Sequence, residues 1–89
     1  MNLTPELREQ VRLSILRYCL RPTRTGLVRA NLRGEGFSLD LDTVQLELDY
    51  LHDKGLLKPN DKRISPENKF WQTTAAGRDE LALQKEETA

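Results

Sequence analysis

The chain has 89 residues, and its 14 basic and 14 acidic side chains give a formal net charge of zero at pH 7. Its apolar share of 37% and charged share of 31% suit one small folded domain, and no apolar run approaches the roughly 20 residues that a membrane span needs. The amino terminus lacks the charged-then-apolar order of a secretory signal, so we expect a cytoplasmic protein without membrane contact. One cysteine excludes an internal disulfide, and one histidine leaves no ligand set for a structural zinc, so no metal or cofactor is expected.

The charges are unevenly distributed along the chain. Residues 1–34 carry seven arginines against two glutamates, a net charge of +5. Residues 35–53 carry six acidic side chains and no lysine or arginine, a net charge of −6, and residues 54–89 are nearly balanced. The chain therefore has a basic first third and an acidic middle.

The first expected helix begins after Thr4, because proline at the first helical position, here Pro5, loses no hydrogen bond. It is expected to run to about Leu20, before an Arg-Pro pair that disfavours helix. Its apolar residues form two stripes, one of Leu7, Val11, Ile15 and Tyr18, the other of Leu13, Leu16 and Leu20. Two stripes are wider than one core face requires, so a C-terminal helix or a second subunit must cover the second.

Two further helices are expected in the middle of the chain. A short one runs from Thr23 or Thr25 to a stop at Gly34, as in the first half of a helix-turn-helix. The longer one begins after Asp40 as N-cap and ends at Gly55. Its predicted buried stripe consists of Leu41, Val44, Leu48 and Leu51.

A β-hairpin and a last helix complete the predicted fold. The strands lie near residues 56–59 and 69–73, a polar loop joins them, and Thr74 caps a helix from Ala75 to about Lys85. Together the elements predict one α+β domain over residues 1–89, with an ordered core of about 4–85. It is a winged helix with a three-helix core, a two- to three-stranded wing and a C-terminal helix. One core is expected to contain Ile15, Leu16, Leu48, Leu51 and Leu57, with Trp71 packed over it and Cys19 buried as a small apolar residue.

Two sequence segments resemble a known family. Residues 48–57 read Leu-Asp-Tyr-Leu-His-Asp-Lys-Gly-Leu-Leu, and residues 71–78 read Trp-Gln-Thr-Thr-Ala-Ala-Gly-Arg. They resemble winged-helix regulators of the MarR and PadR kind, which have a leucine-spaced helix ending in Lys-Gly-Leu-Ile and later a Leu-Thr-x-x-Gly-Arg cap. The resemblance covers roughly residues 10–83, and residues 11–17 more loosely resemble small winged-helix proteins of Mu-like phages. It implies DNA binding, with the third helix in the major groove and the wing on the neighbouring backbone.

The third helix departs from that expectation. Its face opposite the predicted core carries several carboxylates, where a DNA reader would offer Arg, Lys, Asn or Gln, and phosphates repel carboxylates. The basic second helix and the wing are therefore expected to contribute most of the DNA contact, although those arginines could equally pair with the acids of the third helix. The candidate nucleic-acid-binding residues are Arg24, Arg29, Arg33, Thr43, Gln45, Lys62 and Arg63.

Two functions remain open from the sequence, and neither is enzymatic. The first is a transcriptional regulator that binds double-stranded DNA, and a homodimer is expected for it because such regulators read paired half-sites. The second is a protein-interaction module that presents its acidic third helix to a protein partner. The residues expected to contact that partner are Asp42, Leu46, Asp49 and Tyr50.

Overall fold

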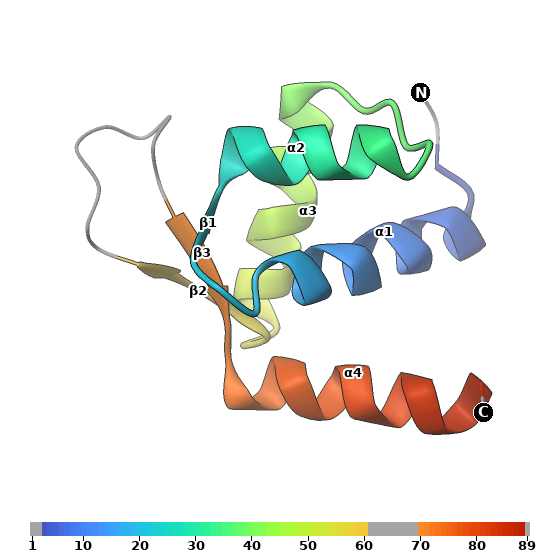
Figure 1. Cartoon of the computed structure of the whole chain (residues 1–89), viewed down its shortest axis with the longest axis vertical. Helices are drawn as coiled ribbons and strands as arrows, with labels where there is room; N and C mark the ends of the chain where they lie inside the picture. Colours follow the sequence, from blue (N-terminus) through green and yellow to red (C-terminus); the bar gives the residue numbers. More distant parts are fainter. Residues whose placement is uncertain (1–2, 61–69, 89) are drawn as a thin grey trace.

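The computed structural model describes residues 3–60 and 70–88 of the chain. Within these residues three helices precede an antiparallel hairpin, and a fourth helix follows it (Figure 1). The elements are α1 (Pro5–Tyr18), β1 (Thr23–Arg24), α2 (Thr25–Gly34), α3 (Leu41–Asp53), β2 (Leu57–Asn60), β3 (Phe70–Thr73) and α4 (Ala75–Thr88). The predicted α+β winged helix is confirmed.

The N-termini of α1 and α3 are set by the two predicted capping residues. Thr4 Oγ1 accepts a hydrogen bond from the Leu7 N–H at 3.2 Å, and Asp40 Oδ1 accepts one from the Thr43 N–H at 2.7 Å. The hydrogen bonds from Thr43 lower the pKa of Asp40 below its usual value, so the carboxylate stays charged at neutral pH. The other end of α1 differs from the prediction, because the helix ends at Tyr18 rather than near Leu20.

Glycines end both α2 and α3 with the same hydrogen-bond pattern. After α3, the Gly55 N–H donates to the His52 carbonyl and the Leu56 N–H donates to the Leu51 carbonyl, both at 2.9 Å. This is a Schellman motif, which needs a left-handed residue, and Gly55 has a φ of 76°. Gly36, with a φ of 96°, has the corresponding place after α2, two residues beyond the predicted stop. The turn at Gly55 leads directly into β2, and the turn at Gly36 begins the connection to α3.

The sheet has three strands in the order β1-β3-β2, all antiparallel. The central strand β3 places Trp71 between Thr23 on one side and Pro59 on the other. Proline is tolerated there because β2 is an edge strand of this sheet, where a missing N–H costs no ladder bond. The two-residue strand β1 was not located from the sequence.

The core lies between α1, α2, α3 and the sheet, and its predicted members are all buried. Trp71 and Cys19 are buried too, and burial raises the pKa of the Cys19 thiol to about 12, so it remains a protonated, apolar group. The predicted stripe of α3 is wrong at one position. Leu41 is 47% exposed at the first residue of the helix, whereas Glu47 is buried beside Leu48.

Buried Glu47 joins α3 to α1. Its Oε2 accepts a hydrogen bond from Arg12 Nε at 2.6 Å, and its Oε1 lies 3.7 Å from Arg8 Nε. A buried carboxylate needs such partners, because desolvation otherwise opposes its charge. Among the described residues, the arginines that pair with an acid of α3 therefore come from α1, and not from α2, which was one of the alternatives left open by the sequence.

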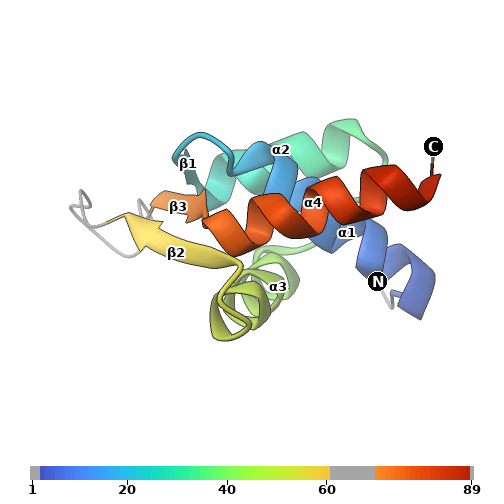
Figure 2. The same cartoon turned by 90° about the horizontal axis from the view of Figure 1, so that it is seen from below.

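The helix α4 begins directly after β3, beside the turn that follows α3, and then runs alongside α1 (Figures 1 and 2). Thr74 Oγ1 accepts from the Gly77 N–H at 3.1 Å, as predicted for a cap, and donates to the Gly55 carbonyl at 2.7 Å. Gly77 is buried, and a methyl group on it would overlap the Leu56 carbonyl oxygen. The close approach of α4 to the turn after α3 thus depends on a glycine. The helix continues to Thr88, three residues beyond the predicted end.

We expect Gly77→Ala to lower the free energy of unfolding by about 1–3 kcal/mol, because the overlap with Leu56 outweighs the gain in helix propensity. Gly34→Ala is the matched control, since Gly34 is also helical and nothing lies within 4 Å of the added methyl group. That variant should be neutral or up to about 1 kcal/mol more stable. Urea unfolding measures the free energy of unfolding of both variants, and equal changes in the two would contradict the close contact of Gly77 with Leu56.

Removing the charge of Glu47 should also destabilise the fold. We expect Glu47→Gln to cost about 1.5–3 kcal/mol, because the charge-assisted hydrogen bond from Arg12 is removed at a buried site. Glu9→Gln removes the same charge from an exposed position of α1 and should change stability by no more than about 0.5 kcal/mol. Thermal or urea unfolding in which the two variants behave alike would show that the Glu47 pair contributes nothing to the fold.

Candidate nucleic-acid interface

Arg24 lies where α2 begins and beside the base of the hairpin. It pairs with Phe70 in the sheet, and Phe70 pairs with Asn60, the last described residue before the hairpin connection. The side chain of Arg24 is exposed and makes no hydrogen bond or ion pair to any described residue. Among the described residues no side chain caps the N-terminus of α2, so both a guanidinium and backbone N–H groups are available there.

The other two arginines of α2 differ in their surroundings. Arg29 is half-buried, and its Nε donates to the Leu39 carbonyl at 3.1 Å, so it supports the connection that leads into α3. Arg33 is exposed in the last turn, and within the described residues it has no ion-pair partner. Nine residues separate it from Arg24, which corresponds to about 13 Å along a helix axis. The three predicted cations therefore do not form one cluster.

The face of α3 away from the core is acidic with an apolar centre. Leu46 is 68% exposed, the largest value among the large apolar residues that the structure describes. Gln45 Nε2 donates to Asp49 Oδ1 at 3.0 Å, so these two side chains form a fixed pair beside Leu46. Thr43 is half-buried in the first turn, where its N–H donates to the capping carboxylate of Asp40, and Asp42 is exposed next to it.

Tyr50 has partners that the sequence did not reveal. The Arg12 guanidinium lies 3.6 Å from the centre of the Tyr50 ring, and Lys54 Nζ lies 5.6 Å from it. Arg12 thus binds Glu47 with one edge and covers Tyr50 with its plane, a cation–π arrangement that fixes the ring on α3. Tyr50 remains 38% exposed. It is a less accessible anchor than Leu46.

Two of the predicted contact residues, Lys62 and Arg63, lie outside the described residues. They belong to the connection between β2, which ends at Asn60, and β3, which begins at Phe70. Their sequence position joins them to the end of the sheet where Arg24 lies.

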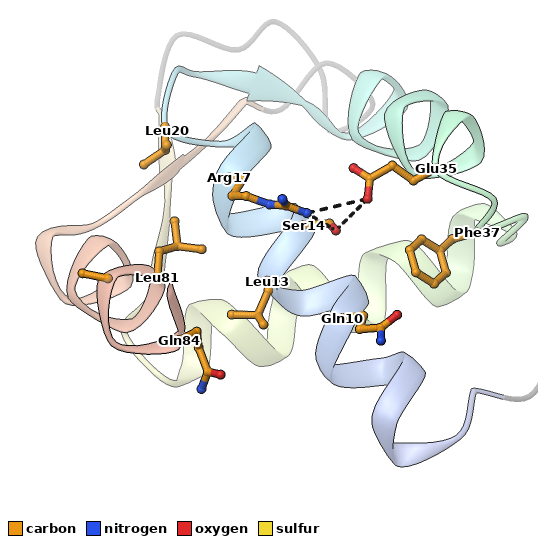
Figure 3. A pocket seen from close by; sticks show the side chains of 10 residues that line it. Gln10, Leu13, Ser14, Arg17, Leu20, Glu35, Phe37, Leu81 and Gln84 are labelled. Atoms are coloured by element: carbon orange, nitrogen blue, oxygen red, sulfur yellow. Dashed lines mark hydrogen bonds and ion pairs between the residues drawn. The ribbon is translucent and has the colours of Figure 1, made fainter. Parts of the chain in front are cut away.

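A groove of about 810 Å³ runs between α1, α4 and the connection that follows α2 (Figure 3). Its apolar walls are formed by Leu13, Leu20, Phe37 and Leu81. On one side Arg17 Nη2 donates to Ser14 Oγ at 2.9 Å and lies 3.7 Å from Glu35 Oε1, which accepts from the Ser14 hydroxyl. The second apolar stripe of α1 is therefore only partly covered by α4.

Three features of this surface were absent from the sequence interpretation. They are the pairing of buried Glu47 with Arg12, the contact of Arg12 with Tyr50, and the hydrogen bond from Arg29 to the Leu39 carbonyl. Each of these interactions joins residues at least ten positions apart. A hint existed for Glu47, which falls beside Leu48 on the predicted buried side of the helix. Among the described residues no group of three His, Cys, Asp or Glu side chains could hold a metal ion, and no helix is long and apolar enough to cross a membrane.

The chain matches no protein-family model and no curated protein, but its structure is similar to solved structures. A PadR-family transcriptional regulator from Eggerthella lenta shares 23% identity over 92% of this chain and 75% of that one, with a TM-score of 0.75. A PadR-family transcription regulator from Clostridium difficile shares 22% identity over 86% and 84%, with a TM-score of 0.70.

The third similar structure is Bacillus subtilis PadR in complex with operator DNA. It shares 18% identity and a TM-score of 0.64 over 91% of this chain, which spans 46% of that protein. All three similarities confirm the fold expected from the two sequence segments. The chain has the winged-helix fold found in PadR-family transcriptional regulators.

Proposed function

We propose that this protein is a DNA-binding transcription regulator that grips the duplex backbone through the start of α2 and the wing. The observation that carries the proposal is the shared fold with regulators of which one is bound to operator DNA. The start of α2 supports it, because Arg24 is exposed and, among the described residues, no side chain pairs with Arg24 or caps the helix N-terminus, and both groups favour phosphate. Arg33 adds a second cation that has no ion-pair partner among the described residues, while Thr43 and Gln45 approach the bases from α3.

Phosphate contacts supply most of the binding energy in this proposal. The acids of α3 repel phosphates, so the neutralising charge comes from other elements, with Lys62 and Arg63 in the hairpin connection as further backbone contacts. Arg29 is the weakest of the proposed contacts, since its Nε is already used by Leu39. The cations position the domain, and the side chains of α3 then meet the base edges.

A homodimer is part of the proposal, and the groove beside α1 supports it. Apolar and polar side chains line the groove in equal number among the described residues, and Leu20 in its wall and Leu83 on α4 are exposed apolar residues. A second copy of this chain would remove that surface from water. A twofold dimer would also present two wings to the two half-sites of an operator.

The alternative function is a protein-interaction module, and one observation favours it. Leu46 is exposed on the same face of α3 as Asp42, Asp49 and Tyr50. Residues 41–53 of this helix include no lysine or arginine. A basic protein surface with an apolar pocket would fit that face. If this function holds, Leu46→Ala together with Tyr50→Ala abolishes binding of the partner, and changes in the wing have little effect.

The DNA proposal predicts a steep salt dependence. Binding to a duplex, measured by fluorescence anisotropy over a salt series, should weaken linearly on a log–log plot. Replacing Lys62 and Arg63 by alanine should weaken binding and reduce the slope by about one for each phosphate that is no longer neutralised. Arg78→Ala, an exposed cation on α4, is the control and should leave the slope unchanged. Absence of binding to any duplex at about 50 mM salt would refute the proposal and favour the protein partner.

The dimer is tested separately by sedimentation at tens of micromolar. The wild-type chain should sediment at twice its mass of 10.3 kDa. Leu20→Asp should yield monomers, because it places a charge on the apolar wall of the groove. Leu46→Asp introduces the same charge on α3 and should remain dimeric. A monomeric wild-type protein at this concentration would contradict the proposed assembly.

A further inference from the structure

We infer that α3 reads two base edges in the major groove, with Leu46 against the methyl group of a thymine and Asp49 accepting a hydrogen bond from the amino group of a cytosine. The inference rests on the proposed function, since it requires α3 to enter the groove. It assigns the acidic helix a role in sequence discrimination, while the cations elsewhere supply the affinity.

Leu46 is placed for an apolar contact. It lies in the middle of α3 opposite the buried residues Val44, Leu48 and Leu51, and its 68% exposure leaves most of the side chain accessible to a ligand. In the major groove the one apolar group on a base edge is the 5-methyl group of thymine. A leucine that enters the groove there gains most from a thymine, because no other base carries a methyl group on this edge.

Asp49 lies three residues further along the same face, about 4.5 Å along the helix axis. That separation is close to the spacing of about 3.4 Å between successive base pairs of a strand. Gln45 Nε2 holds one carboxylate oxygen of Asp49 at 3.0 Å, which orients the group. Among the described residues no donor is bound to the other oxygen, Oδ2, so it is available to accept from a base.

The chemistry of a carboxylate selects one base. Guanine presents only the acceptors N7 and O6 in the major groove, and both repel Asp49. Adenine presents its amino group beside the acceptor N7, whereas cytosine presents an amino donor without an adjacent ring acceptor. The N7 acceptor of adenine therefore disfavours a carboxylate beside the adenine amino group, and cytosine is the better partner for Asp49. Since α3 holds no arginine or lysine, it also lacks the side chains that bind guanine edges.

The experiment is a selection from a pool of random duplexes with the wild-type chain and single variants. The wild-type motif should contain a thymine and a cytosine at most one base pair apart. Leu46→Ala should lose the thymine preference only. Asp49→Asn should replace the cytosine preference by adenine, because an asparagine amide can pair with both the amino group and N7 of adenine. Asp53→Asn, an exposed acid in the last turn of α3, is the control and should leave the motif unchanged.

A selected cytosine is always paired with a guanine, so the motif alone does not tell which of the two bases the protein contacts. Chemically altered bases identify the contacted base edge. Replacing the thymine by uracil removes only the methyl group, and should weaken wild-type binding about five- to a hundredfold without affecting Leu46→Ala. Replacing the opposite guanine by 7-deazaguanine removes N7 and should have no effect. Weaker binding with 7-deazaguanine would show that guanine is read, and would overturn the role of Asp49.

The results separate this inference from the proposed function. Tight binding of duplexes without any enriched motif, or a motif that neither Leu46→Ala nor Asp49→Asn alters, would refute the reading by α3 and leave the DNA-binding function standing. Failure to bind any duplex at about 50 mM salt would refute both. A circular-dichroism spectrum unchanged from wild type confirms that each variant is folded, which is expected because both side chains are exposed.

Discussion

The position of Trp71 in the central strand determines how the parts of this small domain are arranged. Its side chain is fully buried, and its Nε1–H donates to Thr25 Oγ1 at 3.0 Å, at the first residue of α2. Its backbone lies between β1 and β2, and its ring meets His52 of α3 edge to face at 6.0 Å. One large side chain therefore fixes the start of α2, the end of α3 and the base of the wing relative to one another. These are the segments that a winged helix brings to its DNA.

A second constraint is the hydrogen-bonded ion pair between Arg12 of α1 and Glu47 of α3, which determines how charge is distributed on α3. Glu47 is turned into the protein and neutralised by Arg12, while the other acids of α3 face solvent. Arg12 of α1 thus balances the buried acid of α3 and covers the ring of Tyr50, and no described ion pair joins a cation of α1 to the exposed acids of α3. Any polyanion that approaches this outer side must be held by charges on other elements, of which Arg24 and Arg33 are exposed and unpaired among the described residues. In the proposed DNA binding, affinity and discrimination therefore come from different parts of the domain.

The elements that local signals define could be predicted from the sequence, and those that depend on distant residues could not. Thr4, Asp40 and Gly55 act within a few residues, so the helix ends they define were recognisable as patterns. Leu41 was assigned to the core by periodicity, which cannot tell that the first residue of a helix extends beyond the elements packed on it. Arg12 and Glu47 are 35 positions apart, and no local rule predicts that they pair. The same limit applied to the site, since Arg29 and Arg24 look alike in sequence and differ only in what surrounds them.

The central claim is that DNA contacts the start of α2 and the outer face of α3. A titration of the ¹⁵N-labelled chain with a duplex, followed by NMR, tests it most directly. We expect the amide signals of Gly26, Leu27, Leu46 and Asp49 to shift at low salt and to return towards their free positions as salt is added. Signals of α4, which packs against α1 and β3, should stay in place. Shifts confined to α1 and α4, or no shifts at about 50 mM salt, would contradict the account.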